Sequence, residues 1–520
     1  MDNGGTTRHT LAVSFASPSR TVRVVASRGV VAALLTALLP AAAAPAGAAD
    51  GEWAFRDVSG LLAGPAPPEP GAEPRYDYGP LWGDLDGDGW IDLLFMNHGD
   101  PPSLYRNGDG ARFEDRFEKS GLRKDVWLYP QHQDRHGGAC ADYDADGDVD
   151  LVITHGAMRG ETLGVKFDEL LANQGDGTFA EVSKQAGVLN EQGRARTPVW
   201  LDYDNDGLLD LLIGNFISPN VLLRNRGDGT FHDVAAELGV DDEGGAHPSW
   251  TDWDGDGDPD LLTLWPVGMS RNDGQGGFTP RPVSNAPGEP WVPGPVATAW
   301  GDFDGDGDAD VFIASRQGPL SRLFANQAGR FAEAPLAIGL GPDEGGAGAA
   351  WGDLDNDGDL DLVVLGTRQA RLLENRGAGG FTSRALPAPG LRPGVDGDVD
   401  LADFDHDGRL DLAINAEDGQ HLFRNELATG SWLVTELRGS ASNAGGLGAT
   451  VSASAAGPIV TGRQHLGDTG FHKSVSCAPL HLGLGESDRV ELEIRWPSGR
   501  RERLAGVPTR RRLVLPEPAG

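Results

Sequence analysis

Short apolar runs recur along most of the chain, and each follows a cluster of aspartate and glycine. Typical runs cover residues 93–95, 151–153 and 362–364. Runs this short, rich in branched and aromatic residues and bounded by turn formers, predict buried β-strands. Further along, a glycine-rich hairpin begins at an asparagine and ends at an aromatic residue, as at 107–113 and 225–231. The pattern therefore predicts short antiparallel strands joined by tight turns.

The acidic cluster is the motif D-x-D-x-D-G-x-x-D, which occurs seven times with starts 50 to 60 residues apart. Each unit has room for four strands, and repeats of this length predict propeller blades. We predict an all-β fold, with a seven-bladed β-propeller over residues 50–430 and a small all-β domain over 431–520. Residues 53–58 resemble the outer strand of a blade, so we expect them to complete blade seven and close the ring.

The repeated motif has the pattern of a calcium loop. Carboxylates at positions one, three and five, the carbonyl of position seven and the aspartate at position nine can surround a hard cation with oxygen. Six or seven oxygens suit Ca²⁺ better than Mg²⁺. The seven loops supply these candidate ligands: Asp84, Asp86, Asp88, Trp90 and Asp92; Asp142, Asp144, Asp146, Asp148 and Asp150; Asp202, Asp204, Asp206, Leu208 and Asp210; Asp252, Asp254, Asp256, Asp258 and Asp260; Asp302, Asp304, Asp306, Asp308 and Asp310; Asp353, Asp355, Asp357, Asp359 and Asp361; Asp403, Asp405, Asp407, Arg409 and Asp411.

The main alternative for these loops is the EF-hand, which begins in the same way but requires a glutamate at position twelve, followed by a helix. Position twelve is Phe95 in the first loop and Ile153 in the second, and no copy has a carboxylate there. Four like charges within nine residues repel one another unless a cation is present. We therefore expect up to seven structural Ca²⁺ ions.

The residue two positions before each loop is tryptophan in five of the seven copies. These positions predict a buried ring of packing residues, although stacking on a ligand is an alternative. Cys140 occupies one such position, so we expect a small buried hydrophobe, and a bond to Cys477 is the less favoured alternative. The seven residues are Trp82, Cys140, Trp200, Trp250, Trp300, Trp351 and Leu401.

The net charge and the N-terminal composition limit the possible binding partners and the cellular location of the protein. The formal net charge of −35 over 520 residues argues against nucleic acid and anionic membranes. An apolar run at 29–44 follows three arginines and precedes small residues up to Ala49, as in a secretory signal over residues 1–49. A membrane anchor is the alternative. We expect a secreted, periplasmic or cell-surface protein with no membrane span after signal cleavage.

The C-terminal region differs from the repeats in its charge, since it has more basic than acidic residues. Two interpretations are open: its arginines dock against the acidic ring, or they form a solvated edge. They are Arg500, Arg501, Arg503, Arg510, Arg511 and Arg512.

Insertions at 118–137 and 155–168 lengthen the first two repeats. By strand parity both rise from the face opposite the acidic loops, which makes that face our candidate ligand site. Its aromatic and polar residues suit a sugar or a peptide, although ordinary long loops are the alternative. The candidates are Trp127, Tyr129, His132, Asp134, Arg135, His136 and His155.

The repeats resemble FG-GAP/VCBS repeats, both in the acidic motif and in the N-x-G-D-G-x-F hairpin. The C-terminal region resembles the ASPIC/UnbV domain at 432–437, 446–451, 481–485 and 495–500. Together they resemble the cartilage-acidic-protein-like family. The resemblance implies a secreted calcium-binding protein whose tail has no established catalytic role.

The favoured function is an extracellular binding or scaffold protein for a glycan or protein ligand, and the sequence carries no nucleophile motif or phosphate loop that would favour catalysis. The alternative is a calcium-dependent lyase or dehydratase acting on polysaccharide at the insertion face. His132, His136 and His155 with Arg135 would supply its acid and base groups.

Overall fold

The computed structural model describes residues 53–519, with gaps of which the longer are 63–76, 98–101, 123–134, 157–166, 282–291, 455–458 and 465–473. The chain divides into two units, Met1–Ala46 and Gly47–Gly520, and the described residues belong to the second. The predicted signal lies outside them. Among the described residues, no helix is long and apolar enough to span a bilayer.

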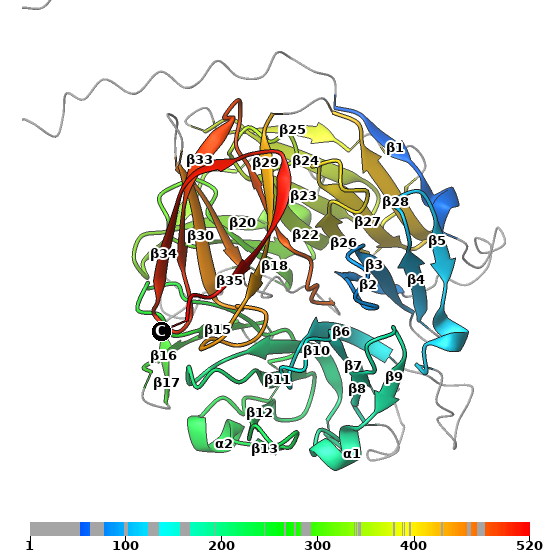
Figure 1. Cartoon of the computed structure of the whole chain (residues 1–520), viewed down its shortest axis with the longest axis vertical. Coiled ribbons are helices and arrows are strands. Elements are labelled where there is room, and N and C mark those ends of the chain that lie inside the picture. Colours follow the sequence, from blue (N-terminus) through cyan, green and yellow to red (C-terminus); the bar gives the residue numbers. More distant parts are fainter. Residues whose placement is uncertain are drawn as a thin grey trace, which may run out of the picture. The chain divides into compact units, whose positions relative to one another are not determined.

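The repeats form blades (Figure 1). The described residues before the C-terminal region form seven four-stranded antiparallel sheets, one for each acidic motif. Blades one and two are β2 (Asp77–Gly83), β3 (Asp92–Asn97), β4 (Ser103–Asn107) and β5 (Phe113–Asp115), then β6 (Arg135–Ala141), β7 (Asp150–His155), β8 (Glu169–Asn173) and β9 (Phe179–Glu181). Blades three and four are β10 (Ala195–Leu201), β11 (Asp210–Asn215), β12 (Val221–Asn225) and β13 (Phe231–Asp233), then β14 (Ser249–Thr251), β15 (Asp260–Thr263), β16 (Gly268–Asn272) and β17 (Phe278–Arg281).

The remaining blades repeat this order, with short helices between some of them. Blades five and six are β18 (Pro295–Gly301), β19 (Asp310–Ser315), β20 (Arg322–Asn326) and β21 (Phe331–Ala334), then β22 (Gly346–Gly352), β23 (Asp361–Gly366), β24 (Ala370–Asn375) and β25 (Phe381–Ala385). Blade seven contains β26 (Asp398–Ala402), β27 (Asp411–Ala416) and β28 (Gly419–Asn425). The helices are α1 (Ser183–Ala186), α2 (Ala235–Leu238) and the 3₁₀ turns η1 (Ser59–Leu61), η2 (Phe117–Lys119) and η3 (Gly318–Leu320).

An N-terminal strand closes the ring. Strand β1 (Phe55–Asp57) pairs antiparallel with β28 and is the fourth strand of blade seven. Phe55 lies opposite Asn425, and the rings of Trp53 and Phe55 stack with centroids 6.3 Å apart. Both side chains are buried in the core of blades six and seven. This confirms the predicted closure, in which residues 370 positions apart in sequence share one sheet.

Aromatic residues fill the space between neighbouring blades. Trp82 and Trp200 are fully buried, so the predicted packing role of these positions is confirmed there. Each stacks on the second residue of the preceding blade's acidic loop: Trp82 on Phe404 with centroids 6.3 Å apart, and Trp200 on Tyr143 at 5.8 Å. These stacked aromatic residues therefore join each blade to the acidic loop of the blade before it.

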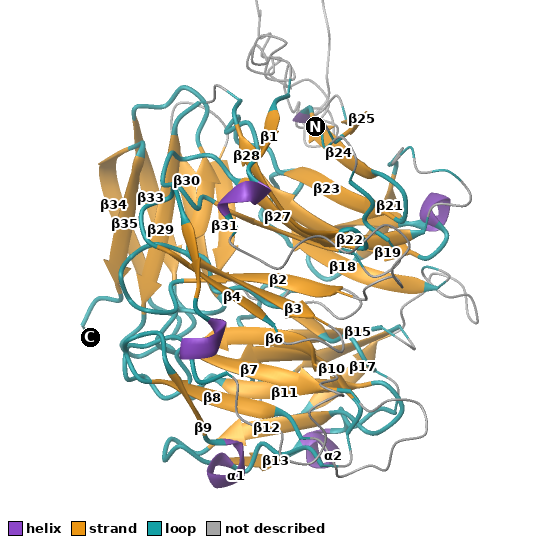
Figure 2. Ribbon diagram, turned by 90° about the vertical axis from the view of Figure 1, so that its right-hand side faces the viewer, coloured by secondary structure: helices purple, strands orange, loops and turns teal. Residues whose placement is uncertain are grey.

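The C-terminal region, hereafter the tail, forms two further sheets with their own core. One has the order β31-β30-β33-β34 and the other β32-β29-β35, in which β29 and β35 run parallel. Figure 2 shows these strands beside the blades. Trp496 and Leu492 are buried in the tail core. The strands are β29 (Trp432–Arg438), β30 (Ala449–Ser454), β31 (Ile459–Gln464), β32 (Leu480–Gly483), β33 (Arg489–Arg495), β34 (Arg501–Pro508) and β35 (Arg511–Pro516).

A tail segment, residues 474–478, lies along the innermost strands of blades one and two. Val475 forms a parallel bridge with Ala139 of β6, and its amide donates to Gly138 O at 2.7 Å. The amide of Cys477 donates to Trp82 O of β2 at 2.9 Å. The tail therefore extends the inner edge of the ring.

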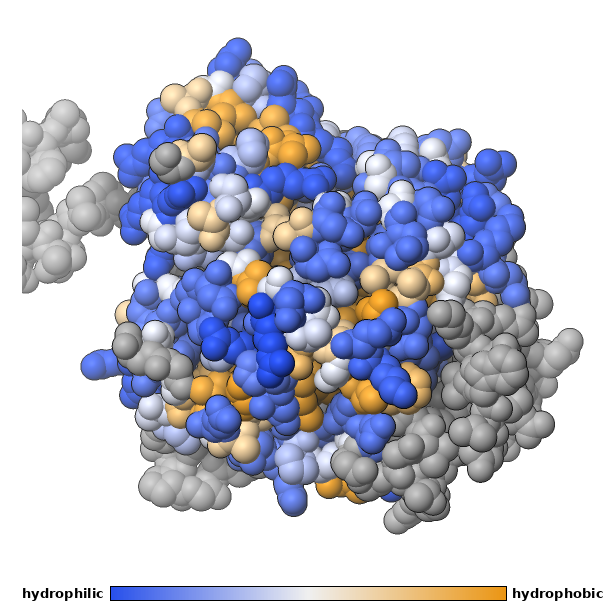
Figure 3. Space-filling view, turned by 60° about the horizontal axis from the view of Figure 1, so that its bottom comes forward, coloured by the Kyte–Doolittle hydropathy of each residue, from blue (hydrophilic) through white to orange (hydrophobic). Residues whose placement is uncertain are grey.

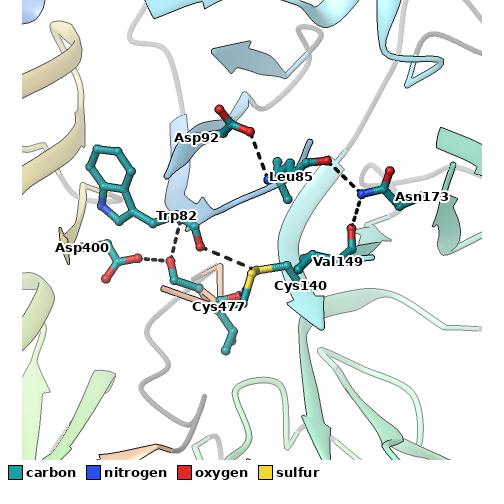
Figure 4. The surroundings of a disulfide bond; sticks show 10 residues. Trp82, Leu85, Asp92, Cys140, Val149, Asn173, Asp400 and Cys477 are labelled. Carbon is teal, nitrogen blue, oxygen red and sulfur yellow. Dashed lines mark hydrogen bonds between the residues drawn. A yellow bond between two sulfur atoms is a disulfide. The ribbon is translucent and has the colours of Figure 1, made fainter. Parts of the chain in front are cut away.

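The same segment carries a disulfide between Cys477 and Cys140 (Figure 4). The expectation of an unbonded Cys140 was wrong, although the residue is buried as predicted. The backbone hydrogen bonds of residues 474–478 bring the two Cα atoms to 5.6 Å, within the range for a disulfide, from positions 337 residues apart. Sequence spacing gives no indication of a pairing made by tertiary contact.

Candidate functional site

The seven acidic loops share one backbone geometry. In the first loop, the amide of Gly89 donates to Asp84 Oδ2 at 2.9 Å, and in the sixth the amide of Gly358 donates to Asp353 Oδ2 at 2.8 Å. The glycine at position six has a φ between 85° and 104° in all seven loops. Only glycine adopts this conformation without strain, so the glycine of the motif is required to turn the loop around its first carboxylate.

The aspartate at position nine begins the second strand and ties the blade together. In blade one, Asp92 Oδ1 accepts from the amide of Asn107 at 2.8 Å, and Oδ2 accepts from the amide of Leu85 at 3.0 Å. Burial, together with the charges of Asp86 and Asp84, raises the pKa of Asp92 to about 8. An ionised carboxylate here gains from a nearby cation. Position nine therefore has a structural role that the motif alone does not reveal.

The loop carboxylates converge as a metal site requires. In the first loop, oxygens of Asp84, Asp86 and Asp92 all lie within 4.8 Å of one another. Ca²⁺ ligands lie 2.3–2.6 Å from the ion, so oxygens at this mutual spacing fit one coordination shell. In the seventh loop, Asp403 Oδ1 and Asp411 Oδ2 are buried and have no hydrogen-bond partner in the described structure. Buried oxygens of this kind are costly unless they bind a ligand, and a hard cation fits them.

The hairpin asparagines connect each loop to the next blade. Asn173 Nδ2 donates to Val149 O of its own blade at 2.8 Å and to Leu85 O of the preceding blade at 2.9 Å. Asn425 Nδ2 likewise donates to Leu354 O at 2.8 Å. Sequence reasoning identified these asparagines as turn residues and missed this contact between blades. Their recurrence in every repeat was the available signal.

An arginine on the third strand neutralises some of the loops. Arg224 Nη2 lies 2.6 Å from Asp204 Oδ2 and 3.3 Å from Asp206 Oδ2 in loop three. Arg106 bridges the equivalent carboxylates of loop one in the same way. Each arginine directly precedes the hairpin asparagine. Nothing in the repeated motif had predicted a role for these arginines.

The tail covers the loops of blades six and seven. The amide of Gly485 donates to Asn356 O at 2.8 Å, and His481 Nε2 lies 3.2 Å from Gly408 O. A Cβ atom on Gly483 would lie only 1.8 Å from Asp353 Oδ2, which shows how closely the tail approaches loop six. As a result Asp353 is buried, and its pKa is raised well above the usual range by burial and then by its neighbouring aspartates.

The tail arginines divide between the two predicted interpretations. Arg512 is close enough to Asp403 and Asp84 for their charges to raise its pKa, although burial outweighs them and lowers it overall. Arg501 and Arg503 are exposed and pair with Glu493 of the tail itself. One arginine therefore faces the acidic ring, whereas these two form a solvated edge.

Of the candidate ligand residues, Arg135, His136 and His155 are described and buried. Arg135 Nη2 lies 2.9 Å from Glu169 Oε1, and His155 Nε2 lies 3.1 Å from the same oxygen. Glu169 was not predicted, and Arg135 and then His155 lower its pKa to about 2 against the effect of burial. Four candidates lie outside the described residues: Trp127, Tyr129, His132 and Asp134.

Comparison with protein families agrees with this geometry. The FG-GAP-like repeat model matches residues 84–153, 142–213, 202–263, 302–364 and 353–414, which together cover more than half of the chain. The chain belongs to the FG-GAP-like repeat family. This FG-GAP-like protein also matches the ASPIC and UnbV model over residues 439–520, so the resemblance noted in its sequence is confirmed.

Individual relatives match a smaller part of this FG-GAP-like protein. Cartilage acidic protein 1 of Xenopus tropicalis is 30% identical over 199 residues, and that of Homo sapiens is 28% identical over 197 residues. Each match covers 34% of this chain and 29% of the relative, so the chain aligns with less than a third of either protein.

Two similar solved structures are lectins. An Agrocybe aegerita lectin that recognises non-reducing terminal N-acetylglucosamine is 20% identical, with 67% of this chain and 88% of that chain covered and a TM-score of 0.43. The BP39L lectin of Burkholderia pseudomallei is 13% identical, with 66% and 90% covered and a TM-score of 0.43.

Proposed function

We propose that this protein is an extracellular calcium-binding propeller that acts as a binding or scaffold protein for a glycan or protein ligand. The observation that carries the calcium part is the repeated loop with its converging carboxylates. Buried oxygens such as Asp403 Oδ1 have no hydrogen-bond partner in the described structure, and a divalent cation would satisfy them. Each loop would hold one ion through the carboxylates at positions one, three, five and nine and the carbonyl of position seven.

The bound ions would have a structural role. They would offset the repulsion among the loop aspartates and fix the turn that connects the first two strands of each blade. A ligand present at ten times its dissociation constant stabilises the folded state by about 1.4 kcal/mol per site. Seven such sites would add up to a large fraction of the stability of a folded chain.

Calcium removal tests this part. We expect gently purified protein to contain bound calcium by elemental analysis, and EGTA to lower the melting temperature by more than about ten degrees. Readdition of calcium should restore the midpoint, whereas magnesium at the same concentration should restore it only partly, because it prefers a tighter octahedral site. An unchanged midpoint in EGTA, together with no bound calcium, would contradict the proposal.

Two features support a location outside the cytoplasm. The apolar run at 29–44 has the composition of a secretory signal. The Cys140–Cys477 disulfide persists most readily in oxidising compartments. Fractionation of cells that express the full chain should find the protein, cleaved near Ala49, outside the cytoplasm. Retention of residues 1–49 in a cytoplasmic fraction would argue against export.

The ligand would bind at the face opposite the loops, which carries the insertions. Phe167 is 41% exposed there and lies two residues before the buried Glu169, so it offers an aromatic surface for a sugar or peptide. On the face of the molecule in Figure 3, hydrophilic residues predominate and apolar residues form small separate groups.

A glycan array followed by a release assay on the hits tests this part. We expect binding that weakens in a Phe167→Ala variant, with no cleavage of the bound glycan. The control is Val514→Ala in the tail, which also removes an exposed apolar side chain. Cleavage that disappears in a His132→Ala/His136→Ala double variant would instead show the lyase or dehydratase alternative.

A further inference from the structure

The acidic loops differ in whether an arginine precedes the hairpin asparagine. Loops two and five each contain five aspartates, and the residue before the hairpin asparagine is Ala172 or Ala325. Loops one and three each contain four aspartates, and the equivalent residue is Arg106 or Arg224. The same local backbone therefore surrounds quite different numbers of charges.

The ion pairs follow the arginine and not the number of aspartates, since loop four also contains five aspartates but has Arg271 before its hairpin asparagine. In loop four, Arg271 Nη2 lies 2.5 Å from Asp256 Oδ2, and Arg271 also pairs with Asp254. In loop seven, Arg424 Nε lies 2.7 Å from Asp405 Oδ2. Throughout the described part of the chain, no lysine or arginine forms an ion pair with the aspartates of loops two and five.

Loop six forms a separate case because the tail covers it. The equivalent residue is Glu374, which pairs with Arg376 at 2.9 Å and Arg384 at 3.0 Å. The loop backbone is held instead by the contact between Gly485 and Asn356. Loops two and five have no such arginine. The tail does not cover them either, since four of their aspartate side chains are exposed: Asp144, Asp146, Asp304 and Asp306.

We propose that the arginine before the hairpin asparagine is a built-in counter-ion, so that loops one, three, four and seven keep their fold without calcium whereas loops two and five require it. The inference rests on the proposed calcium binding. A guanidinium that bridges the carboxylates at positions three and five reduces the repulsion that would otherwise open the loop. It also lowers the local negative charge, and the charge of a calcium site helps to set its affinity. Apart from loop six, which the tail covers, loops two and five are accordingly the tightest calcium sites.

Amide hydrogen exchange on the full chain, in calcium and in EGTA, reports on each loop separately. The amides of Gly147 in loop two and Gly207 in loop three donate to the first aspartate of their loops at 3.1 Å and 3.0 Å, so they report directly on the turn. We expect EGTA to speed exchange at Gly147 at least about fivefold more than at Gly207. The two amides should exchange at similar rates when calcium is present.

The tail approaches loop three at Gly207 but leaves Asp144 and Asp146 of loop two exposed, so it could also slow exchange at Gly207. Paired variants distinguish the effect of the arginine from that of the tail. Arg224→Met should speed exchange at Gly207 in EGTA about fivefold, and Ala172→Arg should slow exchange at Gly147 by a similar factor. The matched controls change the same charge two residues away: Arg226→Met and Gln174→Arg should leave both rates unchanged.

The outcomes distinguish this inference from the proposed function. If calcium slows exchange in all seven loops to the same degree, and the two variants behave like their controls, calcium binding stands and the counter-ion role is wrong. If calcium changes exchange in no loop and none is bound, both proposals fail. Variant effects that appear only in EGTA, with unchanged exchange in calcium, would support the inference.

Discussion

The ring and the tail reach stable folds by different routes. Each blade uses the same parts: an acidic loop, an aspartate that binds two backbone amides, and an asparagine that reaches the preceding blade. The tail has no repeat, contains its own core and attaches to the ring through a disulfide and a short inserted segment. Because the ring is built from repeats, its fold can be predicted from the sequence, whereas the attachment of the tail depends on contacts between distant residues.

The two routes also place their charges differently. The ring concentrates carboxylates in loops where burial and mutual repulsion raise the pKa values of Asp150 and Asp210 to about 8. In the tail, Glu517 accepts from the amides of Ser440 and Ala441, and its pKa is lowered to about 2, with the side chain of Ser498 as the main favourable contact. The ring therefore contains carboxylates that need a cation, and the tail contains one that is satisfied by hydrogen bonds.

The largest effect should come from opening the ring. Deletion of residues 50–60 removes β1, its pairing with β28 and the buried Trp53 and Phe55. Loss of one large buried aromatic side chain costs about 3–5 kcal/mol, so we expect the melting temperature to fall by about ten degrees or more. The control is Arg56→Ala in the same strand, where the side chain is exposed. Equal midpoints for the deletion and the control would show that the clasp is not needed.

A smaller effect should follow from releasing the tail. Cys140→Ala removes a disulfide that closes a loop of 337 residues, which corresponds to a loss of up to about 5 kcal/mol. We expect a melting temperature lower by about five degrees and faster proteolysis between the ring and the tail. A reducing agent should produce the same shift in the native protein and none in Cys140→Ala. A shift of equal size in both would mean that the agent acts elsewhere.

The smallest effect should be the pH dependence of the stability without calcium. Its sign differs between the ring and the tail. Burial raises the pKa of Asp310 to about 8 from 3.8, so the folded ring binds more protons than the unfolded chain between these pH values. In EGTA the stability should therefore fall as the pH rises from about 4 to about 8. For Glu517 the sign is opposite, because its lowered pKa adds stability that is lost as the pH falls from about 5 to about 2.

Thermal melts in EGTA across this pH range provide the measurement. We expect a decrease of a few degrees from pH 5 to pH 8, and saturating calcium should remove or reverse the slope, since the ion favours the ionised carboxylates. Asp310→Asn should reduce the slope in EGTA, because an amide does not titrate, and the equivalent aspartates of the other blades should keep the remainder. A midpoint that rises with pH in EGTA would contradict the predicted protonation of the ring.

The sequence by itself determined the repeated part of the protein. The spacing of the motif predicted the number of four-stranded sheets, the strand after each loop and the glycine at position six, because these features depend on residues close together in the chain. The pairing of residues 53–58 was also predictable, since one strand was missing from blade seven. Their alternation also predicted that the loop carboxylates converge, as those of Asp84, Asp86 and Asp92 do.

Only the tertiary structure decided how the distant parts meet. The bond between Cys140 and Cys477, the tail residues against loops six and seven, and Glu169 beside Arg135 all join positions whose separation carries no signal in a single sequence. The arginines that face some loops and not others belong here as well, because their pairing requires the third strand to lie beside the loop. Local alternation and turn chemistry specify a blade, whereas contacts across the ring depend on packing that no short stretch of the chain contains.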